Sequence, residues 1–130
     1  MYEKFFKFKE AIDKDLTFDE FTVYDLCKRL PNLKHFWVSK LMESKIDLEI
    51  LKKKKNELIK VATEKFKSEI GLRKETAIQK INTSPNVIKI NEAIKETELI
   101  IEYLEKVEKV FSSTSYDIKN VVELLKMQQM

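Results

Sequence analysis

The chain has 130 residues, 25 Lys/Arg against 22 Asp/Glu, and a net charge of +3. That length suits one domain that buries more than half of its unfolded surface. A single glycine and two prolines, with 43% hydrophobic and 36% charged residues, exclude a turn-rich sheet architecture and favour long helices. The composition predicts an all-α protein. Together with the apolar patterns along the chain, it predicts a single domain of residues 1–130, a long antiparallel helical hairpin with short N-terminal helices and a C-terminal helix.

Several classes of site are missing from the sequence. The lone Cys27 cannot form an intramolecular disulfide and is expected to pack as a small hydrophobe. His35 has no Cys or Asp cluster around it at metal-ligand spacing, and Gly71 stands alone, without a phosphate-binding loop. No apolar stretch looks like a signal peptide or a membrane span. We therefore expect no metal, no cofactor, no membrane association and a reducing cytoplasmic location.

Residues 1–30 predict two short helices. The second begins at Thr17, which has capping-box spacing to Glu20. It should end near Leu30, because Pro31 disfavours the helical backbone conformation of the residue before it. The first carries apolar residues at helical spacing, namely Phe5, Phe8, Ala11 and Ile12.

Residues 31–70 predict one long amphipathic helix. Pro31 suits its first position, where a missing N–H has no helical partner anyway. Ser44 and Lys55 are polar interruptions of an apolar heptad seam. The seam consists of Trp37, Leu41, Leu48, Leu51, Leu58 and Ala62, and it is widened by Met42, Ile46 and Ile50.

A second long helix is predicted over residues 84–112, antiparallel to the first. Gly71 is expected to break the preceding helix, and a short helix is expected to reach Ile81. Ser84 then serves as N-cap and Pro85 as the first helical residue. The seam of this helix consists of Val87, Ile90, Ile94, Thr97, Ile101 and Leu104, with Ile88, Ile100, Tyr103 and Val107 beside it.

The last predicted helix covers residues 115–128. The polar run of residues 112–115 reads as a turn in front of it. One apolar stripe on this helix is our hypothesis for the main contact between copies of the chain. It consists of Ile118, Val121, Val122 and Leu125.

Positive charge is concentrated in the middle of the chain. Residues 52–80 carry 10 Lys/Arg against 4 Asp/Glu, whereas the flanking segments are slightly acidic. Four consecutive lysines on a helix point in directions about 100° apart, so they cannot all form one salt-bridged stripe. Such a block suits a polyanion bound through counterion release, although a lysine run can equally be a solvated helix surface. The candidate DNA-binding residues are Lys52, Lys53, Lys54, Lys60, Lys67, Arg73 and Lys74.

The sequence contains no sign of catalysis. No nucleophile has a base beside it in a recognisable pattern, and no pair of acidic groups suggests acid and base roles. The abundant acidic residues have lysines one helical turn away, as with Glu49 and Lys53, which is typical of a solvated surface. We therefore expect a protein that is not an enzyme.

Two short segments resemble a known family. Leu30-Pro31-Asn32-Leu33 is followed by Phe36-Trp37 and a basic helix, and Ser115-Tyr116-Asp117-Ile118-Lys119-Asn120 heads the last helix. This arrangement, over roughly residues 15 to 127, is similar to the UvsY-like recombination mediators of large tailed phages.

The resemblance implies a ring-like homo-oligomer, hexameric or heptameric, that binds single-stranded DNA in the host cell cytoplasm. It implies that the protein loads a RecA-like phage recombinase onto DNA coated by the phage single-strand-binding protein. Among the family's DNA contacts, Lys60 is the best match, whereas the basic position two residues later is Ala62 here. Lys53, Lys54 or Lys67 could take over that contact. Of the family's paired aromatic residues only Phe66 is present.

A second reading comes from a different class of protein. The same apolar seams suit a helical scaffold or adaptor that binds protein partners, with the lysines serving only solubility. Salt-dependent binding of single-stranded DNA distinguishes the two readings.

Overall fold

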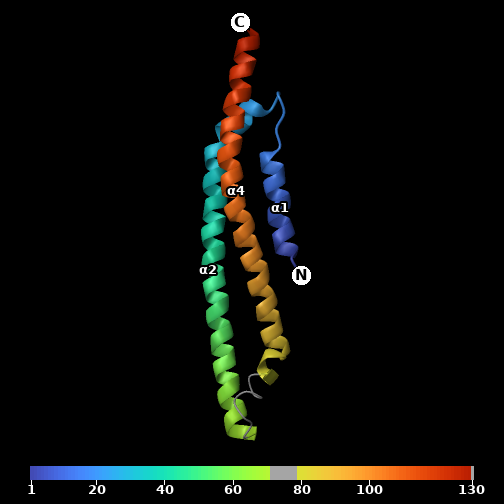
Figure 1. Ribbon diagram of the computed structural model, residues 1–130, viewed down its shortest axis with the longest axis vertical. Helices are drawn as coiled ribbons and strands as arrows, with labels where there is room; N and C mark the ends of the chain where they lie inside the picture. Colours follow the sequence, from blue (N-terminus) through green and yellow to red (C-terminus); the bar gives the residue numbers. More distant parts are fainter. Residues whose placement is uncertain (71–78, 130) are drawn as a thin grey trace.

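The computed structural model describes residues 1–70 and 79–129, with the side chains of residues 66–70 excepted. Its three named helices are α1 (Glu3–Leu16), α2 (Val23–Ile70) and α4 (Pro85–Gln129), and no strand occurs among the described residues. α2 and α4 run antiparallel along the long axis, and α1 lies against one side of the pair (Figure 1). The predicted all-α fold with an antiparallel hairpin is confirmed.

Asp19 sets the start of α2. Its carboxylate Oδ1 accepts hydrogen bonds from the backbone N–H groups of Phe21 (2.9 Å) and Thr22 (3.0 Å), while the Thr22 hydroxyl accepts one from the Asp19 N–H (2.9 Å). This reciprocal pair is a capping box shifted by two residues from the predicted one. Thr17 instead follows the end of α1, where its hydroxyl donates to the carbonyl of Asp13 (2.7 Å).

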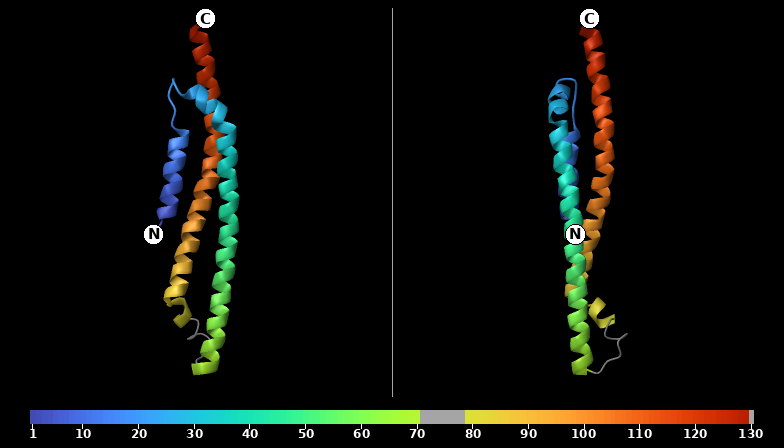
Figure 2. Two further views of the ribbon diagram at one scale, coloured as in Figure 1. Left: turned by 180° about the vertical axis from the view of Figure 1, so that it is seen from behind. Right: turned by 90° about the vertical axis from the view of Figure 1, so that its left-hand side faces the viewer.

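The predicted break at Pro31 was wrong, because α2 continues through it for 48 residues. Proline removes only one helical hydrogen bond, and its usual effect within a helix is a kink. The first turns of α2 indeed lie at an angle to the rest (Figure 2). Leu26 and Leu30 before the proline and Leu33 after it all pack in the same apolar cluster, which holds the two segments together.

The predicted turn at residues 112–115 was also wrong, because α4 is continuous over 45 residues. Ser115 donates its hydroxyl to the carbonyl of Phe111 (3.1 Å), so the hydroxyl bonds back to the helix rather than starting a new one. Phe111 and Ile118 are buried on either side of the serines and lie two turns apart on one face. The start of α4 at Pro85, directly after Ser84, is as predicted.

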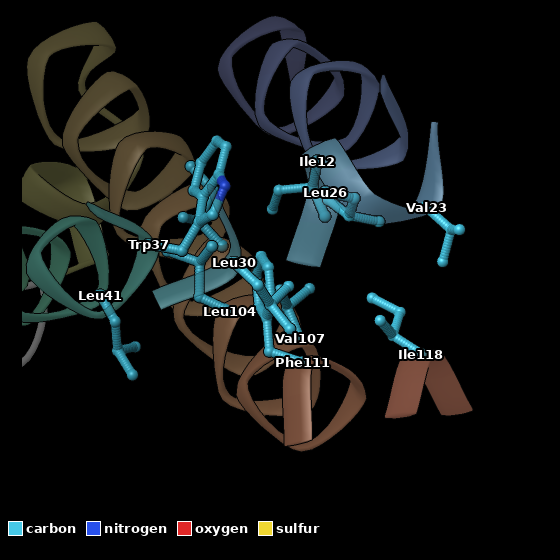
Figure 3. Close-up of a cluster of buried hydrophobic side chains, with 11 residues drawn as sticks. Ile12, Val23, Leu26, Leu30, Trp37, Leu41, Leu104, Val107, Phe111 and Ile118 are labelled. Carbon is cyan, nitrogen blue, oxygen red and sulfur yellow. The ribbon is translucent and has the colours of Figure 1, made fainter. Parts of the chain in front are cut away.

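The core lies at the end of the hairpin where α1, the start of α2 and the second half of α4 meet. Figure 3 shows Leu30 of α2 close to Leu104, Val107 and Phe111 of α4. Trp37 is also buried, and its indole N–H donates to Asp15 Oδ2 at 3.0 Å, which links α2 to α1. The other buried members of this cluster are Ile12, Val23, Leu26, Leu41, Ile100 and Ile118.

Both predicted seams lie at the contact between α2 and α4. On α2, Trp37, Leu41 and Ser44 are buried and the later seam positions are half-buried; on α4, Val87 and Leu104 are buried. The predicted widening of the α2 seam was wrong, because those side chains are largely exposed to solvent, although Met42 also lines a pocket beside α4. They are Met42, Ile46 and Ile50, with exposed fractions of 52%, 57% and 45%. Cys27 is exposed as well, not packed.

Candidate nucleic-acid interface

The candidate interface lies on the middle of α2, beyond the core. Lys52, Lys53, Lys54 and Lys60 are all exposed. Lys55 is half-buried because it occupies a seam position that faces α4. The four-lysine run is therefore divided: three lysines point to solvent and one lies along the helix contact.

Lys53 and Lys60 share one face of α2. They are seven residues apart, which places them two turns and about 10 Å apart on the side away from α4. Lys67 is seven residues further along the helix, but its side chain lies outside the described part of the structure. Arg73 and Lys74 also lie outside it, as do the predicted break at Gly71 and most of the short helix after it.

The exposed lysines of this block have no fixed acidic partner among the described residues. Six ion pairs are present there, and none involves Lys52, Lys53, Lys54 or Lys60. The expected neighbour Glu49 lies farther than ion-pair distance from Lys53. Lysines without partners carry mobile counterions, and the counterions released when lysines neutralise phosphates are the main driving force for binding.

The predicted oligomer contact is only partly available on the surface. Ile118 is 1% exposed and packs inside the subunit's own core, so it was wrongly placed in an exposed stripe. Val121, Val122 and Leu125 are half-buried against the same cluster. Their role between copies of the chain stays a prediction. In the same part of α4, Leu124 and Met127 are 60% and 67% exposed. The C-terminal end of α4 projects past the other helices (Figure 1).

Sequence reasoning missed a pocket between α1 and α2. It has a volume of about 340 Å³ and an aromatic floor formed by Phe8, Phe36 and Trp37, with Ala11 beside them. Its rim consists of Lys4, Lys7 and Lys40. The available signal was the alternation of aromatic residues and lysines in residues 4–8, but which residues of α2 face it depends on how α1 packs.

The described residues hold no group of three His, Cys, Asp or Glu side chains suited to a metal ion. His35 is exposed. Within the described residues, no helix combines the length and apolar character that a membrane crossing needs.

Comparisons with known proteins find a similar fold among solved structures but no match in sequence. No protein-family model matches the chain, and no curated protein matches its sequence. Among solved structures, it is similar to a crystal structure of the bacteriophage T4 recombination mediator protein UvsY (lattice type IV) with a TM-score of 0.77 and 12% identity, over 94% of this chain and 96% of that one. A second crystal form (lattice type II) gives 0.73 and 13%, over 95% and 96%. The chain therefore shares the fold of the T4 recombination mediator UvsY along nearly its whole length.

Proposed function

We propose that this protein is a recombination mediator that binds single-stranded DNA and helps to load a RecA-like phage recombinase onto DNA coated by the phage single-strand-binding protein. The observation that carries the proposal is the fold shared with the T4 recombination mediator over 94% of the chain. The unpartnered lysines of α2 support the DNA-binding part. The proposed place of action is the host cell cytoplasm.

The lysines suit binding that ignores base sequence. They are exposed, flexible point charges on a helix surface, and they offer no rigid donor pattern that could read base edges. A mediator needs contacts that can be made and released on any sequence. Repeating a weak contact in a hexameric or heptameric ring-like homo-oligomer would raise its overall strength through effective concentration.

Recombinase loading tests the proposal directly. The DNA-dependent ATPase of the phage recombinase is followed on single-stranded DNA precoated with the phage single-strand-binding protein. Addition of this protein should shorten the lag before steady ATP hydrolysis, and a variant with Lys52, Lys53, Lys54 and Lys60 changed to Glu should not. An unchanged lag with the parent protein, at concentrations where the DNA is bound, would contradict the mediator role.

A helical scaffold or adaptor is the second candidate, and one observation favours it. The outer side of α2 exposes Ile46, Ile50 and Val61, and apolar side chains exposed along one helix can mark a contact with a protein partner. A scaffold would use this side for a protein partner and would show no salt-dependent affinity for DNA.

A further inference from the structure

The pocket between α1 and α2 combines two features that suit a nucleotide. We propose that it takes one unstacked base of single-stranded DNA on its aromatic floor, with the adjoining phosphates on its lysine rim. This inference rests on the proposed function, because it assigns a second contact site for the same single strand. The site lies on a different part of the molecule from the lysines of the α2 block.

The aromatic rings on the floor of the pocket pack against one another. Phe36 packs edge-to-face with Trp37 (centroids 5.0 Å apart, 87° between planes), and Trp37 packs in the same manner with Phe8 (5.9 Å, 66°). The hydrogen bond from the Trp37 indole to Asp15 fixes the tryptophan further. Phe36 nevertheless remains 49% exposed. A ring that is held in place and open to solvent can stack on a base with little loss of side-chain entropy.

The rim supplies positive charge, and no acidic side chain lines the pocket. Lys7 has no ion-pair partner among the described residues. Lys4 lies 3.9 Å from Asp47, and Lys40 lies 3.2 Å from Glu43. All four of those side chains are more than one-third exposed, so these pairs are weak and can give way to a phosphate.

Lys40 connects the rim to the floor. Its Nζ lies 5.4 Å from the centroid of the Phe36 ring, within the range of a cation–π contact. One lysine can therefore bind a phosphate while it stays beside the ring on which the base stacks. A flat ligand with an aromatic face and an adjoining negative charge fits these groups better than the apolar face of a helix would. An apolar helix face carries no negative charge to pair with the three lysines of the rim.

The pocket and the α2 block can share one strand. Phe36 and Lys40 lie on the same helix as Lys52 and Lys60, between 12 and 24 residues earlier in the sequence, which corresponds to about 18 to 36 Å. α2 then serves as a track with an aromatic contact near one end and phosphate contacts further along.

The test uses the full-length protein and two fluorescein-labelled strands of equal length, one of oligo-thymidine and one of abasic sugar-phosphate units. Fluorescence anisotropy gives the affinity for each strand. The parent should prefer the thymidine strand, and Phe36→Ala should remove that preference and weaken the affinity for it by roughly 5- to 100-fold, as expected for one stacked base. Phe21→Ala is the matched control, because Phe21 is 87% exposed and lies outside the pocket.

Two further measurements guard against indirect effects. Trp37 is the only tryptophan, so its emission should change when the thymidine strand binds and stay constant with the abasic strand. Lys7→Gln, which leaves the floor intact, should weaken the binding of both strands by a similar factor.

The inference is overturned if the parent binds DNA but shows equal affinity for both strands and constant Trp37 emission; the proposed function then stands. It is also overturned if Phe36→Ala dissociates an oligomer while the preference for thymidine persists, because a second copy then occupies the pocket. Failure of the parent to bind either strand removes the proposed function as well.

Discussion

At the residue scale, Asp19 decides where α2 begins. The sequence predicts a capping box of Thr17 and Glu20, whereas the structure has one of Asp19 and Thr22. Local spacing alone does not decide the position of the cap, which lies between the buried residues Ile12 of α1 and Val23 of α2. The N–H groups of Phe21 and Thr22, which donate to the carboxylate, hold the pKa of Asp19 below its ordinary value of 3.8.

Replacement of Asp19 by Ala should destabilise the protein in a pH-dependent way. The carboxylate's pKa is lowered in the folded state, so its contribution is fully present above the ordinary carboxyl pKa and disappears as pH falls through the lowered one. Urea unfolding of both proteins should show the largest difference at neutral pH and a smaller one in acid. Glu20→Ala, at the other capping-box position, should have little effect; a larger effect than Asp19→Ala would contradict this assignment.

Ile118 lies in the subunit's own core rather than on its surface. Its position in an apolar stripe suits either a contact between subunits or a core position, and its burial shows that it is a core residue. Ile118→Ala should lower the free energy of unfolding by about 2 to 5 kcal/mol, because it leaves a cavity. Leu124→Ala, at a 60% exposed side chain on the same helix, should change it by less than about 0.5 kcal/mol. Chemical denaturation followed by circular dichroism measures both, and equal effects would contradict the packing described.

At the scale of elements, the sequence predicted the helices better than their ends. Apolar periodicity identified both arms of the hairpin, because each arm buries one face along its length. Local preference alone predicts boundaries at Pro31 and at the polar run of residues 112–115. In both places, buried side chains on either side of the weak point keep the helix continuous, and such long-range packing does not show in local sequence.

The continuity of α4 can be tested at Ser113, which is exposed. Proline there removes a helical hydrogen bond and clashes with the preceding turn, so Ser113→Pro should lower the free energy of unfolding by about 3 kcal/mol or more. Ser113→Ala is the control and should leave stability unchanged or slightly raised. Full tolerance of the proline in thermal unfolding would show that this segment is a turn.

At the scale of the whole molecule, the antiparallel hairpin followed from two amphipathic helices joined by a short connection. The placement of α1 did not follow, because its aromatic residues could have packed on either arm or on another copy. That placement creates the lysine-rimmed pocket, so the pocket could not be predicted from the sequence. The lysine block of α2, in contrast, is predicted from charge alone, and Lys52, Lys53, Lys54 and Lys60 are exposed, as expected.

Assembly should depend on the end of α4. Val122→Glu combined with Leu125→Glu places charge on the part of these half-buried side chains that the subunit's own cluster leaves uncovered, and it should convert the proposed ring into smaller species in sedimentation velocity. Helical content by circular dichroism should stay near that of the parent, which separates dissociation from unfolding. An unchanged sedimentation coefficient in a folded variant would exclude this end as the main contact between copies.

The salt dependence of single-stranded DNA binding tests the role of α2 more directly than any other measurement. Fluorescence anisotropy at several salt concentrations should show that the logarithm of affinity falls linearly with the logarithm of salt concentration for the parent. Lys60→Gln should lower the affinity and make the slope shallower by about 0.7 for each phosphate that the variant no longer neutralises. Lys119→Gln, at an exposed lysine on α4 far along the sequence from the block, should leave both the affinity and the slope unchanged. Equal slopes for the parent and Lys60→Gln, or weak binding that salt does not affect, would contradict the assignment of α2 as the DNA-binding helix.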